Sequence, residues 1–209
     1  MAPSRLSLLA VGLAFAAAAT FPCRYPAPSA NFSANTYTGT WYEIGRTQTF
    51  GGGFFQRNCV CTQLKVGPYV PGGDAAVENV CREKTISGPS VAFNATLAHQ
   101  SPPGHWLETP PSTGVNYTVI EIGAFPNVEA QISSPCLHLG FLAVSGEDFS
   151  VEYDCREDSL LGPQYCVHIL SRSPTMDPAL EASLLARAYA LDLNPANITY
   201  KTTLQEGCW

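Results

Sequence analysis

Downstream of position 20, apolar and polar side chains alternate in short runs separated by turn residues. A period of two over about four to eight residues is typical of β-strands that bury one face. Such runs predict strands at 41–47, 59–66, 75–81, 90–98, 117–123, 137–144, 149–154, 165–172 and 199–203. Clusters of glycine and proline separate several of these runs. The pattern predicts an all-β chain of successive hairpins, whose edges a small antiparallel up-and-down barrel would protect by closure.

One segment, 178–191, has the periodicity of a helix instead. Asp177 stands at the N-cap position and Pro178 at the first helical position, where its missing N–H costs nothing. The apolar residues that recur at helical spacing are Leu180, Leu184, Ala188 and Leu191. We expect this stripe to pack on the outer wall of the barrel. By contrast, 99–114 contains four prolines and two glycines and is predicted to be a long loop inserted in the domain.

The first 19 residues are typical of a secretory signal peptide. Arg5 precedes the apolar run 6–19, which ends in consecutive alanines and is shorter than the roughly 18 residues that span a bilayer. No later apolar run is long enough to span a membrane. The prediction is a secreted protein, without an integral membrane segment, whose residues 20–209 form a single domain.

The cysteines and the glycosylation sequons agree with export. All eight cysteines lie beyond residue 20, and an even number in an exported chain indicates disulfides, although spacing alone leaves their connectivity open. Sequons place candidate glycans on Asn31, Asn94, Asn116 and Asn197. The formal net charge of −6, with no run of basic residues, argues against a nucleic-acid partner.

Three stretches resemble one known family: GTWYEI at 39–44, VEYDC at 151–155, and the segment 165–208 that begins YCVHILSRSP. Together they resemble lipocalins of the apolipoprotein D and insect bilin-binding type, in order along the whole exported chain. The resemblance implies an eight-stranded antiparallel barrel that is closed at one end, with one C-terminal α-helix packed outside.

The resemblance also implies roles for individual residues. Gly39 would let the backbone approach closely at the closed end, where Trp41 would plug the barrel beneath the stacked guanidinium of Arg172. It implies the disulfides Cys23–Cys155 and Cys59–Cys208. The remaining cysteines suggest, from their places on the predicted strands, the pairs Cys61–Cys81 and Cys136–Cys166.

A barrel with apolar inward positions would enclose a small hydrophobic ligand, such as a fatty acid, sterol, retinoid, carotenoid or bilin. Which parity of the strands faces inward stays open, because both faces carry apolar residues. Gly51 to Gly53 would form, with the next two residues, either a mobile lid or a floppy loop at the open end. The candidate ligand-binding residues are Phe54, Phe55, Trp106, Phe141 and Tyr153.

Two other functions remain open. A lipocalin-fold enzyme of the de-epoxidase or isomerase type would need an acid, a base or a thiolate inside the barrel. No known catalytic motif is present, so no catalytic residue and no cofactor is predicted. His138 and His168 are the one pair of histidines worth testing as catalytic groups. An unpaired cysteine in the folded protein would favour an enzyme. A metal site at Cys59 and Cys61 is disfavoured outside the cell. The other function is that of an extracellular interaction or inhibitor module. The sequence also leaves open whether the protein contacts a membrane surface or a receptor, and what its oligomeric state is.

Overall fold

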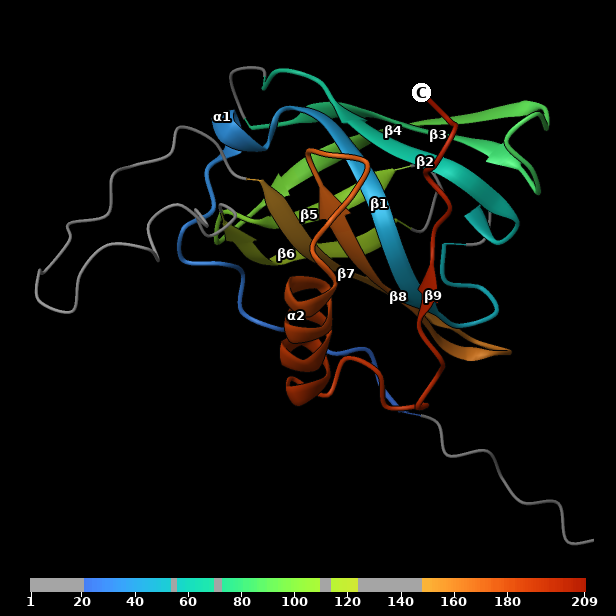
Figure 1. The fold of residues 1–209 in the computed structure, drawn as a ribbon. Helices are drawn as coiled ribbons and strands as arrows, with labels where there is room; N and C mark the ends of the chain where they lie inside the picture. The colour runs from blue at the N-terminus through green and yellow to red at the C-terminus, as the bar shows by residue number, and fades with distance from the viewer. Residues whose placement is uncertain (1–20, 54–55, 70–72, 110–113, 124–147) are drawn as a thin grey trace, which may run out of the picture.

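The computed structural model describes residues 21–53, 56–69, 73–109, 114–123 and 148–209. These residues form nine strands and two helices (Figure 1). The strands are β1 (Gly39–Gln48), β2 (Cys59–Val66), β3 (Ala75–Glu83), β4 (Ser90–Gln100), β5 (His105–Thr109), β6 (Val115–Gly123), β7 (Phe149–Asp158), β8 (Gly162–Ser171) and β9 (Lys201–Thr202). The helices are α1 (Ala34–Tyr37) and α2 (Pro178–Ala190).

Strands β1 to β8 form a closed antiparallel barrel. Each strand from β2 to β7 pairs with the next along the chain, and β1 pairs with both β2 and β8. Closure leaves no free edge on these strands, which explains how a chain of short hairpins avoids exposing unpaired backbone groups. The predicted fold class, an eight-stranded up-and-down barrel with a helix outside, is confirmed for the described residues.

Helix α2 lies against the outer wall of the barrel, as Figure 1 shows. The Asp177 carboxylate caps it by accepting hydrogen bonds from the N–H groups of Ala179 (2.9 Å) and Leu180 (3.0 Å). Leu184 and Ala188 are buried from this helix and pack on outward-facing apolar residues of β7 and β8. Leu191 was expected in the same stripe, but it follows the last helical residue and is exposed.

The closed end is built around a fully buried tryptophan. Trp41 has no exposed surface, and the guanidinium carbon of Arg172 lies 3.5 Å from the centre of its ring. Arg172 also donates to the backbone carbonyls of Thr36, Thr38 and Thr40 at 2.6 to 3.0 Å. Gly39 has φ +111°, a left-handed conformation that residues with a side chain rarely adopt. The arrangement has the form that the resemblance implies.

The loop predicted at 99–114 is wrong in its centre, because β5 occupies His105–Thr109 and pairs with β4 and β6. The first two prolines of the segment lie in the turn that precedes β5, so they interrupt no pairing. Trp106 on this strand is 1% exposed and packs in the closed-end cluster beside Phe32 and Tyr69. Strand β5, which was not predicted, is therefore one of the eight barrel strands. The predicted strand 137–144 lies outside the described residues.

The C-terminal tail runs along the seam between β1 and β2. The first half of β1 pairs with β2, and its second half pairs with β9 at Gly45 and Arg46. A Cβ at Gly45 would lie 2.2 Å from the Tyr200 hydroxyl, so only glycine lets the tail approach this closely. The Gln205 side-chain amide then donates to the carbonyls of Glu43 (2.9 Å) and Thr62 (2.8 Å), one on each side of the seam.

Three disulfides join the described residues: Cys23–Cys155, Cys59–Cys81 and Cys61–Cys208. The first is the pairing that the resemblance implies. The expected Cys59–Cys208 and Cys61–Cys81 pairs are wrong, because β2 has an irregularity at Cys61. This residue adopts φ +55° and its N–H donates to Leu204 of the tail, so its side chain meets the tail while Cys59 meets β3.

The expected Cys136–Cys166 pair involves Cys136, which lies outside the described residues. Within the described residues Cys166 is a free, buried thiol. The four sequon asparagines, Asn31, Asn94, Asn116 and Asn197, are all exposed, which is the condition for glycosylation, and their modification stays a prediction.

Replacing Arg172 by lysine tests the closed end. A lysine keeps the charge but cannot stack flat on Trp41 while donating to three carbonyls, so we expect Arg172→Lys to lower the free energy of unfolding by about 1–2 kcal/mol. Urea unfolding measures the change. Arg57→Lys is the matched control, because Arg57 also lies over a ring, that of Phe50, but on the exposed surface. Equal losses in the two variants would contradict this account of the closed end.

Candidate ligand-binding cavity

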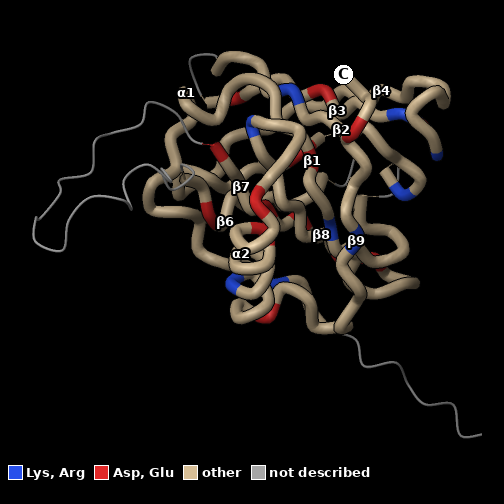
Figure 2. Tube along the Cα trace, in the orientation of Figure 1, with Lys and Arg blue, Asp and Glu red and all other residues tan. Residues whose placement is uncertain are grey.

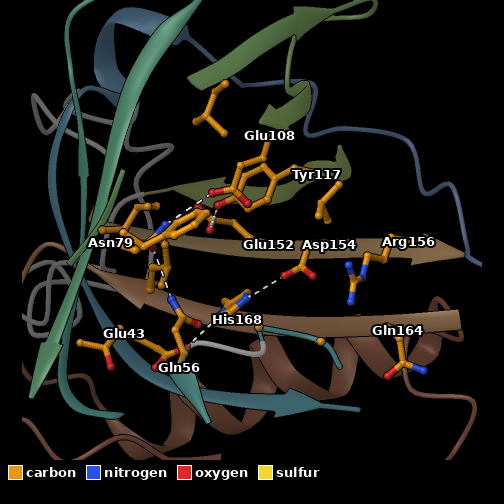
Figure 3. A pocket seen from close by; sticks show the side chains of 18 of the residues that line it. Glu43, Gln56, Asn79, Glu108, Tyr117, Glu152, Asp154, Arg156, Gln164 and His168 are labelled. Carbon is orange, nitrogen blue, oxygen red and sulfur yellow. Dashed lines mark hydrogen bonds and ion pairs between the residues drawn. The ribbon is translucent and has the colours of Figure 1, made fainter. Parts of the chain in front are cut away.

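The barrel interior holds a cavity of about 470 Å³ between the closed-end cluster and the β1–β2 loop (Figure 3). Its apolar wall comes from β2, β4, β6 and β8 and consists of Leu64, Phe93, Leu97, Val115 and Leu170. Its polar side chains are Glu43, Gln56, Thr62, Asn79, Glu108, Tyr117, Glu152, Asp154, Arg156, Gln164 and His168. The expectation of an apolar interior is therefore wrong in part, because polar and charged side chains line the cavity together with the apolar ones.

The alternation along β7 explains how charged residues come to line the interior. Glu152, Asp154 and Arg156 line the cavity, whereas Val151 and Tyr153 belong to the apolar cluster that packs under α2. Strand β8 repeats this division, with His168 inward. Both faces of these strands are buried. Their apolar residues therefore pack against the helix, although the sequence pattern was equally compatible with their lining the cavity.

The structure places two of the five predicted ligand-binding residues away from the cavity. Tyr153 faces α2 and is 2% exposed, and Trp106 is packed in the closed-end cluster without lining the cavity. Phe54, Phe55 and Phe141 lie outside the described residues. Of the two histidines singled out, His168 lines the cavity, whereas His138 is outside the described residues.

Glu43 on β1 is the centre of a buried ionic network. Its carboxylate accepts hydrogen bonds from Arg46, from Nδ1 of His168 (2.8 Å) and from the Thr203 hydroxyl (2.9 Å). Burial works to raise the pKa of Glu43, but Arg46 and His168 outweigh it and hold the pKa at about 2. Glu43 is therefore ionised at neutral pH.

His168 links this network to the cavity. Its Nε2 lies 2.9 Å from Oδ2 of Asp154, so both ring nitrogens contact carboxylates. Burial alone would lower the pKa of His168, but the Cys166 sulfur and these two carboxylates raise it well above its ordinary value. The ring is an imidazolium that is already shared between Glu43 and Asp154.

A second group of carboxyls lies deeper in the barrel. Glu152 is 1% exposed and accepts hydrogen bonds from the hydroxyls of Tyr37, Tyr117 and Ser150. Burial raises the pKa of Glu152 to about 8, and Asp154 and Glu108 contribute to the rise. Burial and the charge of Asp154 raise the pKa of Glu108 to about 7. Near neutral pH Glu152 is therefore largely protonated, and Glu108 is about half protonated.

One group of side chains in the described residues has the ligand types of a metal site: the donor atoms of Asp154, Cys166 and His168 lie within 4.8 Å of one another. Both His168 nitrogens are engaged by carboxylates, so an ion would have to displace one of them. Burial raises the pKa of Cys166 to about 11, which keeps it a thiol, and it does not line the cavity. The metal site considered at Cys59 and Cys61 is overturned, because both are in disulfides.

The described part of the β1–β2 loop packs on the rim of the cavity. The Gly51 N–H donates to Oε1 of Gln164 (2.6 Å), and a Cβ at Gly52 would lie 2.0 Å from the Tyr165 carbonyl oxygen. Gly51 to Gly53 all line the cavity. The glycines thus permit close contact with β8, and a lid movement of this loop stays a prediction.

The sequence reasoning missed Glu43, Glu108, Glu152 and Asp154, although part of the signal was present. In the stretch 150–156, SVEYDCR, polar and apolar residues alternate strictly, and a helix covers only one face of a barrel strand. The charged residues of this stretch could have been assigned to the barrel interior if the apolar residues that alternate with them had first been assigned to the face covered by the helix. Glu43 carries no comparable signal, because its partners come from β1, β8 and the tail.

Comparison with solved structures identifies the fold. Lobster apocrustacyanin A1 is 16% identical with a TM-score of 0.55, over 83% of this chain and 79% of that one. The cockroach allergen Per a 4 is 16% identical with a TM-score of 0.55, over 90% and 97%. The siderocalin Ex-FABP is 13% identical with a TM-score of 0.53, over 84% and 97%. These are lipocalin structures, so the chain has the lipocalin fold; identities this low show the fold alone. No protein-family model and no curated protein matches the chain.

Removing the charge of Glu43 tests the ionic network. Glu43→Gln leaves Arg46 and His168 without their buried counter-ion, so the free energy of unfolding should fall by about 3–5 kcal/mol. Glu78→Gln is the control, because Glu78 pairs with Lys65 on the surface at 3.1 Å and should cost about 0–1 kcal/mol. Urea unfolding at pH 7 compares the two. A loss below about 1 kcal/mol for Glu43→Gln would contradict the role of the network.

The raised pKa of Glu152 predicts how stability depends on pH. Between about pH 4.5 and pH 8 the folded state keeps the Glu152 proton that the unfolded chain releases, so the stability is fully present below this window and falls as pH rises through it. One such group contributes a slope of about 1.4 kcal/mol per pH unit. The raised pKa values of Glu108 and His168 act in the same direction.

Unfolding free energies of the protein and of Glu152→Gln between pH 5 and pH 8 check this prediction. The variant should have a shallower slope, since its amide does not titrate, while Glu108 and His168 leave part of the slope in place. Identical slopes would show that Glu152 is already ionised throughout this range.

Proposed function

We propose that this chain is a secreted lipocalin, of the apolipoprotein D and bilin-binding type, that binds a small and largely apolar ligand inside its barrel. The observation that carries the proposal is the cavity of about 470 Å³, which lies within the range of small-molecule sites and is lined by both apolar and polar side chains. The siderocalin Ex-FABP, which has a similar fold, is described as acting through dual ligand specificities.

Several features support export. Three disulfides join the described residues, and disulfides form in oxidising compartments. The signal peptide predicted at 1–19 lies outside the described residues. Neither described helix has the length and hydropathy that a membrane span requires.

Binding is favoured over catalysis. An enzyme of the kind considered would need a reactive group facing the substrate, and the free cysteine was the residue that would favour one. Cys166 is a protonated thiol with no exposed surface. His168 is held by carboxylates on both nitrogens, which leaves neither free to act as a base.

Contacts with other macromolecules stay predictions. Phe50, Leu160 and Leu161 are exposed apolar side chains near the open end and suit contact with a membrane surface or a receptor. Lys and Arg residues are spread over several elements in Figure 2, which gives no support to a nucleic-acid partner.

Displacement of the neutral apolar probe N-phenyl-1-naphthylamine tests the binding function. We expect saturable fluorescence enhancement with one site per chain, and competition by one or more of retinol, a fatty acid, a sterol, a carotenoid and a bilin. Val115→Trp places an indole in the cavity and should weaken probe binding about tenfold or more, a loss of about 1.4 kcal/mol.

Ala92→Trp is the matched control, because Ala92 is exposed and lies on the opposite face of β4 from the cavity-lining Phe93. It should leave the affinity for the probe unchanged. Absence of saturable binding, or equal weakening by both tryptophans, would rule out the cavity as the ligand site.

A further inference from the structure

We propose that the cavity selects an organic cation, a protonated amine on an apolar body, whose ammonium group lies between Glu108 and Asp154. This inference rests on the proposed function and specifies the ligand class of the same cavity. Its basis is the excess of hydrogen-bond acceptors over free cations around the space that the ligand would fill.

Three carboxyls from two strands face this space. Glu108 comes from β5, and Glu152 and Asp154 come from β7; Figure 3 shows them around the same region of the cavity. They are close enough that Asp154 raises the pKa of both Glu108 and Glu152. Bringing like charges together in a buried site is unfavourable unless a cation or protons compensate them.

Two of the cations nearby are already committed. His168 is shared between Glu43 and Asp154, and Arg46 donates to Glu43, the Gln56 carbonyl and Thr203. Among the described residues, neither Glu108 nor Glu152 forms an ion pair. Glu108 accepts a hydrogen bond from the Asn79 amide, which lies 3.5 Å away and is therefore a weak partner.

Two further acceptors point to a missing donor. Gln56 is 5% exposed and its Oε1 has no hydrogen-bond partner, although its Nε2 donates to Asn79. The Thr62 hydroxyl, on a residue 2% exposed, is also without a partner. Both side chains line the cavity, and Figure 3 shows Gln56 directed into it. Buried polar groups are normally satisfied, so a ligand with several N–H donors would complete this site.

The rest of the lining fits the body of such a ligand. Leu64, Leu97 and Leu170 provide apolar contacts, and the Tyr117 ring beside the carboxyls can receive a cation over its face. Arg156 lies two residues beyond Asp154 toward the open end, so it is the cationic side chain that an anionic ligand would contact. An anion bound deeper would face the three carboxyls.

Isothermal titration with three ligands that share one body tests the inference: 4-phenylbutylamine, 4-phenylbutan-1-ol and 4-phenylbutanoate, each added to the full oxidised chain at pH 7. We expect the amine to bind about tenfold or more tightly than the alcohol, and the carboxylate to bind least. Glu108→Gln should remove most of the preference for the amine over the alcohol. Glu206→Gln, on the exposed tail, is the control and should change neither affinity.

Proton release gives a second readout that needs no variant. Near neutral pH Glu152 is largely protonated and Glu108 is partly protonated, and the two are faced by Asp154, His168, Tyr117 and Asn79. An ammonium group would displace part of this proton population, so titrations in two buffers of different ionisation enthalpy should reveal release for the amine and none for the alcohol. Equal release for both would overturn the inference.

The outcomes separate this inference from the proposed function. Equal or tighter binding of the alcohol or the carboxylate, or an equal effect of Glu108→Gln on all three ligands, would overturn the cation and leave the binding cavity in place. Binding of N-phenyl-1-naphthylamine without binding of any phenylbutyl ligand would do the same. Failure of the probe and of all three ligands would overturn the proposed function itself.

Discussion

The buried carboxylate of Glu43 is the interaction on which the barrel wall depends. It lies where β1 stops pairing with β2, and it gathers Arg46 from its own strand, His168 from β8 and Thr203 from the tail. A lone charge in this position would be very costly, but two cations and a hydroxyl compensate it. Its partners come from three segments far apart in the sequence. The same network therefore stabilises both the closure of the barrel wall and the position of the tail.

The apolar core is divided in two, and this division leaves the interior open to polar groups. One cluster surrounds Trp41 and fills the closed end, while the other lies outside the barrel between α2 and strands β7 and β8. Burial in these two places supplies the hydrophobic stabilisation that a filled barrel would obtain from its centre. The middle of the barrel is therefore free to hold carboxyls and a cavity, at the cost of raised pKa values at Glu108 and Glu152.

The sequence predicted the parts of the fold that depend on local pattern. Period-two runs, the Asp177 cap and the surroundings of Trp41 are each written in a few neighbouring residues, and the structure places them accordingly. Strand β5 was missed because prolines on both sides dominate a short segment. The cysteine pairing and the inward parity of β7 depend on the irregularity at Cys61 and on which face α2 covers. These are long-range outcomes, so the acidic character of the candidate site could not be derived from spacing alone.

The tail along the seam also adds a segment to the barrel wall near its open end. At the closed end the described circumference is made by eight strands, with β1 next to β2, whereas nearer the mouth β9 adds a further segment beside β1. Adjacent strands are about 4.8 Å apart, so this extra segment widens the wall on one side only. The wall beside β1 is thus completed by a segment that is synthesised after all eight barrel strands.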